Sequence, residues 1–150
     1  MFYFIHVLAG AVIAKYFPSI IPIIILSIIF HFLLDIIPHR DSLFTKKVFK
    51  KSYKIRFNDK AVLFETIKAF LTFLFIIYIQ IKFKSSLMLF SIFISLLPDI
   101  VKIGYLTRLR DNKIFKNYIY FHSRIQTIIP WVPGILIQLI VSLILIKLLF

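Results

Sequence analysis

Five long apolar runs alternate with short polar stretches along the chain. The runs cover residues 2–14, 20–37, 61–81, 87–103 and 128–150. A helix needs about 20 apolar residues to cross the hydrocarbon core of a bilayer. The last four runs have that length, whereas the first is short and could span, re-enter or lie at the interface. The pattern predicts an all-α fold: one integral-membrane helical bundle over residues 1–150, with four full-length spans plus a short N-terminal segment.

Basic residues concentrate in two of the connections between these runs. Residues 39–60 carry eight Lys and Arg and residues 105–126 carry five, whereas the connections on the opposite side and the C-terminal end carry four. Positive charge is retained on the cytoplasmic side of membrane proteins. We therefore expect two basic cytoplasmic loops, 39–60 and 105–126, in a protein of the bacterial inner membrane.

Charge and cysteine content narrow the partners and the metal chemistry. A net charge of +13 would indicate nucleic acid in a soluble protein, but in a chain that is 61% hydrophobic it indicates anionic lipid head groups of the bilayer instead. No nucleic-acid partner is expected, and the oligomeric state is left open. The chain has no cysteine, so any metal must be held by nitrogen and oxygen ligands.

Three ionisable residues lie at the end of the second apolar run: His31, Asp35 and His39. Ionisable groups at membrane depth are costly and normally have a partner or a function. Positions four apart share one face of a helix, so these side chains could hold a metal ion or share a proton. The simpler alternative is a hydrogen-bonded pair between His31 and Asp35.

The predicted orientation places further ionisable groups at the same side of the membrane. His6 begins the first run, Glu65 lies early in the third, Asp99 ends the fourth, and His122 precedes the fifth. All four histidines and all six acidic residues then fall on the cytoplasmic side. We expect the bundle to gather several of them into one layer.

Several strings also resemble a known group of proteins. They are His6 with residues 9–11 (Ala-Gly-Ala), residues 31–39, residues 97–99 (Leu-Pro-Asp), and residues 121–124 with 130–134. These strings resemble small bacterial integral-membrane proteins known as membrane-bound metal-dependent hydrolases. The string His-x3-Asp-x2-Pro-His is also more distantly similar to zinc-dependent phospholipase C. The resemblance rests on about a dozen positions spread over most of the chain, and it implies a metal site more than a particular reaction.

Residue chemistry suggests a role for each candidate. Neutral imidazole and carboxylate suit zinc, iron or manganese, and we expect a divalent metal, zinc first. His39 is either a further ligand or an acid–base group, and Glu65 is a general base or a carboxylate that orients a ligating histidine. Arg40 and Arg124 could grip an anionic phosphate. The expected metal ligands are His6, His31, Asp35, Asp99 and His122.

Three functions are compatible with this pattern. The first is a membrane-embedded metal-dependent hydrolase, acting on a lipid or another phosphoester from the cytoplasmic leaflet. The second is a metal or proton carrier, which would need polar groups across the whole bilayer. The third is a non-catalytic, holin-like basic membrane protein. In that case His6 would be interfacial, His39 and His122 would border solvated loops, and Glu65 would pair with Lys68.

Overall fold

The computed structural model describes residues 2–39, 60–106 and 112–150, and these residues are organised as helices. Each apolar run forms one helix, with ends that differ from the predicted ends by no more than three residues. The all-α prediction is therefore confirmed for the described part of the chain. The helices are α1 (Tyr3–Tyr16), α2 (Ile20–Ile36), α4 (Lys60–Phe83), α5 (Ser86–Leu106), α6 (Lys113–Ile125) and α7 (Trp131–Leu149).

In the described part of the chain, two helices are long and apolar enough to cross a membrane, namely α4 over Leu63–Phe83 and α7 over Trp131–Leu149. Only 11% and 17% of their most apolar windows are buried inside the protein, so most of this apolar surface faces outward. α1 and α2 are apolar but shorter, with 14 and 17 residues. The predicted four full-length spans are therefore shown only in part, as two candidate spans.

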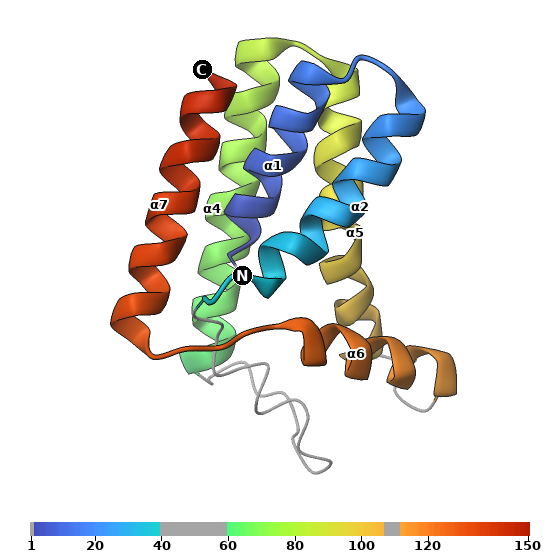
Figure 1. Cartoon of the computed structure of the whole chain (residues 1–150), viewed down its shortest axis with the longest axis vertical. Helices are drawn as coiled ribbons and strands as arrows, with labels where there is room; N and C mark the ends of the chain where they lie inside the picture. The colour runs from blue at the N-terminus through green and yellow to red at the C-terminus, as the bar shows by residue number, and fades with distance from the viewer. Residues whose placement is uncertain (1, 40–59, 107–111) are drawn as a thin grey trace.

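The first helix lies at the centre of the bundle. α1 packs against α2, α4, α5 and α7, and α6 lies across one end of the bundle (Figure 1). Val7, Leu8 and Ala11 of α1 are fully buried against Ile79 of α4 and Ile92 of α5. A helix that is apolar on all sides is expected at such a position, because every face meets another helix.

Small residues bring α1 and α5 close together. A Cβ atom on Gly10 would lie 2.9 Å from both the Cα of Ile92 and the carbonyl oxygen of Ser91. The hydroxyl of Ser91 donates to the carbonyl of Gly10 at 2.7 Å, and that of Ser95 donates to the carbonyl of His6 at 2.8 Å. This close approach is the packing that small residues permit between apolar helices. It fixes the turn of α1 that carries His6.

The predicted loop at 105–126 contains a helix that the hydropathy pattern did not indicate. In α6, the side chain of Asn112 accepts a hydrogen bond from the backbone N–H of Ile114 at 2.9 Å and so caps the helix. Ile119 and His122 are buried on its inner face, whereas Lys116 and other polar residues are exposed. When apolar residues occupy a single face of a helix, polar residues alternate with them along the sequence and the mean hydropathy of the segment is low. Such a helix contains no long apolar run, so the hydropathy pattern does not indicate it. Most of the other predicted loop, 39–60, lies outside the described residues.

Candidate metal centre

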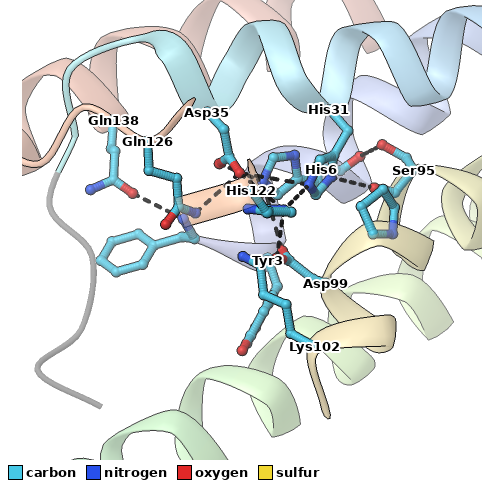
Figure 2. A network of polar contacts seen from close by, with 12 residues as sticks. Tyr3, His6, His31, Asp35, Ser95, Asp99, Lys102, His122, Gln126 and Gln138 are labelled. Atoms are coloured by element: carbon cyan, nitrogen blue, oxygen red, sulfur yellow. Dashed lines mark hydrogen bonds and ion pairs between the residues drawn. The ribbon is translucent and has the colours of Figure 1, made fainter. Parts of the chain in front are cut away.

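Five ionisable side chains from four helices meet at the end of the bundle that α6 covers (Figure 2). His6 comes from α1, His31 and Asp35 come from α2, Asp99 comes from α5, and His122 comes from α6. None of the five is more than 7% exposed. These are the five residues that the sequence suggested as metal ligands.

Three of the ligand atoms form a nearly regular triangle. The Nε2 of His31 lies 3.2 Å from the Nε2 of His122 and 3.6 Å from the Oδ2 of Asp35. The third edge, from His122 to Asp35, is 3.5 Å. Ligands bound tetrahedrally at about 2.0–2.1 Å from an ion are separated by about 3.3 Å, so a zinc-sized ion fits this triangle. Three protein ligands would leave a fourth position for water or substrate, as in catalytic zinc sites.

A second group with suitable spacing shares His31 with the first. The ligand atoms of His6, His31 and Asp99 lie within 4.8 Å of one another. The Nε2 of His6 lies 3.5 Å from the Oδ1 of Asp35 and 3.9 Å from the Oδ2 of Asp99. The carboxylate of Asp35 therefore lies between the two groups, with Oδ1 toward His6 and Oδ2 toward His31 and His122. Buried His and Asp residues could thus hold a metal ion at this point.

Hydrogen bonds prepare one histidine for metal binding and leave two others unsatisfied. The Nδ1 of His31 lies 2.8 Å from the carbonyl oxygen of Ser95, which can only accept, so Nδ1–H donates and Nε2 keeps its lone pair. Within the described residues, both ring nitrogens of His6 and the Nδ1 of His122 have no hydrogen-bond partner. A buried nitrogen without a partner is costly, and a bound ion would relieve that cost at His6.

Three further polar residues contact the acidic ligands or their helix. The ammonium of Lys102 lies 2.7 Å from the Oδ1 of Asp99, and the amide of Gln126 donates to the Oδ2 of Asp35 at 3.1 Å. The hydroxyl of Tyr118 donates to the carbonyl of Pro98 at 2.8 Å. Burial, with the nearby carboxylates of Asp99 and Asp35, raises the pKa of Tyr118, so this hydroxyl keeps its proton.

The same surroundings keep the imidazole on α6 neutral. Burial lowers the pKa of His122 to about 4, and the charge of Lys102 acts in the same direction, while Asp35 and Asp99 oppose it. His122 is therefore neutral at pH 7. Neutral imidazole is the form that binds metals, so no proton has to leave this side chain first.

Sequence reasoning overlooked these supporting residues, although spacing offered a signal for them. Tyr118, His122 and Gln126 are four apart and share a face of the segment that forms α6 and its end. Lys102 follows Asp99 by three residues, which also places the two side chains on one helical face.

His39 and Glu65 lie outside the two groups that could hold a metal. His39 is buried, its Nδ1–H donates to the carbonyl of Ile37 at 2.8 Å, and its backbone pairs with that of Ile128. The Oε1 of Glu65 lies 2.7 Å from the ammonium of Lys68. Glu65 thus makes the ion pair that was the alternative to a catalytic role.

The two expected phosphate-binding arginines are not part of the cluster as described. Arg124 is exposed on α6, and it follows His122 by two residues. Residues two positions apart in a helix point in directions about 200° apart, so Arg124 and His122 lie on opposite faces of α6. Arg40 lies outside the described residues. Lys102 is instead the cation whose contact with the cluster is observed.

The arrangement combines the ligands of a divalent-metal site with a neighbouring cation at a buried end of the bundle. Neutral imidazoles with a carboxylate can hold zinc, iron or manganese. Lys102, adjacent to Asp99, could bind an anionic group beside such an ion. No protein-family model, curated protein or solved structure matches the chain.

Proposed function

We propose that the protein is a membrane-embedded, metal-dependent hydrolase of phosphoesters, with zinc as the first candidate metal. The observation that supports it most directly is the triangle of His31, Asp35 and His122, with edges of 3.2–3.6 Å. Beside it, the buried Nδ1 of His6 has no hydrogen-bond partner within the described residues, which is a second reason to expect a ligand at this point.

The neighbouring residues suggest how the reaction would be organised. A divalent metal would supply a Lewis acid and a water molecule acidic enough to act as nucleophile near neutral pH. Lys102, in contact with Asp99, would hold the phosphoryl oxygens, and the carboxylate of Asp99 would accept the proton of the water. The water oxygen would form a bond to phosphorus while the bond between phosphorus and the alcohol oxygen breaks. The departing alcohol oxygen would then take up the proton that Asp99 accepted from the water.

Membrane attachment in this proposal comes from α4 and α7. Both present mostly exposed apolar surface over a length that could cross a bilayer. The positive-inside bias would then place the basic connections in the cytoplasm of a bacterium, with the cluster at the cytoplasmic leaflet. Anionic lipid head groups would be the natural surroundings of these connections.

The two alternative functions account less well for the cluster. A metal or proton carrier needs a polar path across the bilayer, whereas both groups that could hold a metal in the described residues lie at one end of the bundle. A non-catalytic basic membrane protein has no reason to bring three histidines and two aspartates from four helices into contact.

Metal content tests the proposal directly. We expect about one divalent ion per chain in purified wild-type protein, measured by elemental analysis, and a loss of most of it in Asp35→Asn, because this carboxylate contacts three histidines. Glu65→Gln is the matched control: it removes a carboxylate of the same bundle that is paired with Lys68, and it should keep the metal.

Hydrolysis of bis(4-nitrophenyl) phosphate, a water-soluble phosphodiester, is measured on the same samples. Activity should follow the metal, be lost on chelation and return when zinc is added. Wild-type protein without metal, or Asp35→Asn with an undiminished metal content, would contradict the proposal.

A further inference from the structure

A pocket between α4 and α5 leads to the cluster. Its volume is about 160 Å³, it is open to the surroundings on one side, and its inner end includes Asp99. Thr72, Phe73 and Ile76 of α4 form one wall, and Leu96 of α5 forms the other. From Ala69, which also lines it, to Ile76 the pocket follows α4 for about 10 Å, at 1.5 Å per residue. We call this pocket the α4–α5 groove.

The walls of the α4–α5 groove are suited to hydrocarbon. Among the described residues that line it, Asp99 is the only charged one. The hydroxyl of Thr72 donates to the carbonyl of Lys68 at 2.8 Å, and that of Tyr3 donates to Glu65 at 3.3 Å, so both lining hydroxyl protons are already used within the protein. A polar ligand would therefore lose its hydrogen bonds to water along the walls without replacing them.

The open side of the α4–α5 groove faces the same surroundings as the candidate span of α4. Phe73, on its rim, is 58% exposed, and its neighbours Phe70 and Leu71 on the outer surface of α4 are each 59% exposed. Such a continuous apolar surface is stable in acyl chains and unstable in water. A molecule that enters the groove from the side would come from the bilayer.

The inner end of the α4–α5 groove has the opposite character. There Asp99 is paired with Lys102 at 2.7 Å and contacts His6 and His122 at 3.9 and 3.8 Å (Figure 2). An anionic group beside Lys102 would lie next to the candidate metal position. Lys102 is not among the residues that line the groove, but its contact with Asp99 places an ammonium group just beyond the inner end, where a head group could bind. The groove therefore fits a hydrocarbon chain along its walls and a charged head group at the cluster.

We infer that the α4–α5 groove holds one acyl chain of an anionic membrane phospholipid, which enters sideways between the two helices and presents its phosphoester to the cluster. This inference rests on the proposed function for the reaction, but the binding of the lipid can be measured without it. The phosphate lies against Lys102, and the chain lies along Thr72 and Ile76.

Substitutions two residues apart on α4 separate the groove from the general lipid-facing surface. Ala69 lines the groove, whereas Leu71 is not among its lining residues and is 59% exposed. Positions two apart lie on opposite faces of a helix, so Ala69→Trp fills the groove and Leu71→Trp adds the same side chain outside it. Ala69→Leu is a smaller filling for the case in which tryptophan prevents folding.

Native mass spectrometry of protein from detergent micelles containing dioleoylphosphatidylglycerol counts the lipids retained. We expect one lipid to stay on the wild type and on Leu71→Trp, and retention to fall about tenfold in Ala69→Trp and in Lys102→Met. Equal retention in Ala69→Trp and the wild type would overturn the inference. If the wild type retained neutral dioleoylphosphatidylcholine equally well, the inference that the bound lipid has an anionic head group would be wrong.

The reaction is followed in vesicles of dioleoylphosphatidylglycerol beside the soluble bis(4-nitrophenyl) phosphate. Ala69→Trp should lower hydrolysis of the lipid about tenfold more than hydrolysis of the soluble ester. Equal effects on both substrates would contradict a chain-binding groove. Metal content is measured in the same samples. Lipid retention without metal would support acyl-chain binding in the groove and refute the proposed metal-dependent function. Bound metal without lipid retention would support the metal site and refute acyl-chain binding in the groove.

Discussion

At the scale of single residues, each of three candidate ligand side chains in the cluster is held by a further contact. His31 is oriented by the carbonyl of Ser95, and Asp35 accepts from Gln126. Asp99 is paired with Lys102. Such contacts fix the direction of a ligand and its protonation state before an ion arrives. The contact with Lys102 differs from the other two, because it places a positive charge beside the candidate ion.

Replacing that charge should separate metal affinity from catalysis. We expect Lys102→Met to bind zinc about tenfold more tightly, because the ammonium no longer repels the ion and no longer competes for Asp99. The same change should lower kcat/KM for an anionic phosphodiester about tenfold, since the oxygens lose their cation. Competition with a chelator of known affinity gives the first value and steady-state kinetics the second. Weaker zinc binding in Lys102→Met would contradict this role.

The neutral imidazole of His122 makes the stability of the chelated protein depend on pH. Its pKa falls from 6.5 to about 4 on folding, so the unfolded chain takes up a proton that the folded chain does not. Above pH 6.5, His122 does not lower the free energy of unfolding. As the pH falls from 6.5 toward 4, the proton taken up by the unfolded chain lowers this free energy by about 3 kcal/mol, at 1.36 kcal/mol per pKa unit. Asp35, Asp99 and Lys102 face this group, and their charges are part of the effect.

Chemical unfolding of chelated protein between pH 7.5 and 4 measures this loss. The comparison is with His122→Gln, which lacks the titrating group and should lose less stability over the same interval. Parallel curves for the two proteins would show that His122 is not the group responsible.

At the scale of secondary-structure elements, two parallel helices present the same spacing of polar residues. Ser27, His31 and Asp35 follow one face of α2, and Ser91, Ser95 and Asp99 follow one face of α5. The hydroxyls of Ser27 and Ser91 lie 3.1 Å apart, and His31 contacts the carbonyl of Ser95, so both contacts join positions 64 residues apart. Contacts at one constant separation require helices that run in the same direction. The two aspartates therefore end at the same level.

The close approach of α1 to α5 positions His6 at that level. We expect Gly10→Ala to lower the free energy of unfolding by about 1–3 kcal/mol, because its methyl group would meet backbone atoms of Ser91 and Ile92, which cannot rotate away. The helices must then separate one turn from His6, so metal affinity should fall as well. Thermal unfolding and metal titration measure the two effects. Unchanged stability would show that the two helices do not pack this closely.

At the scale of the whole molecule, the polar cluster and the apolar exterior lie on different elements. The residues of the cluster come from α1, α2, α5 and α6, whereas the candidate spans are α4 and α7. The central α1 packs against both sets of helices. A membrane protein of this form would expose α4 and α7 to lipid and keep its ionisable groups at one end, where their desolvation is limited.

Labelling of introduced cysteines tests the orientation, because the chain has no cysteine of its own. Ser42→Cys lies in the sequence predicted as a basic cytoplasmic loop, and Ser85→Cys lies between α4 and α5. In intact cells, a membrane-impermeant maleimide should label the Ser85→Cys variant but not the Ser42→Cys variant, because connections rich in Lys and Arg are retained on the cytoplasmic side. Equal labelling at both positions, or release of the protein by alkaline carbonate without detergent, would contradict the predicted topology.

The helical fold was readable from the sequence to a large extent. Continuous apolar runs of helical length predicted α1, α2, α4, α5 and α7 with nearly the observed ends, because burial and length together leave few alternatives to a helix. The amphipathic α6 was missed, since its apolar residues occupy a single face. The candidate ligands were also identifiable, because histidine and aspartate are conspicuous within apolar surroundings.

The sequence by itself determined the helices, because each long apolar run has the length of one. It also determined that the ionisable groups gather near one end, because such groups are costly to bury singly in apolar surroundings. Only the tertiary structure decided which of those groups meet. His39 and His31 lie on one face of the same predicted segment, yet α2 ends at Ile36 and the backbone of His39 pairs with that of Ile128. His122 comes from a helix that apolar runs did not reveal, and the cation observed beside the cluster is Lys102, whereas Arg124 is exposed on the opposite face of α6. Ligand geometry depends on how helices distant in sequence pack together, and no spacing within one helix specifies that packing.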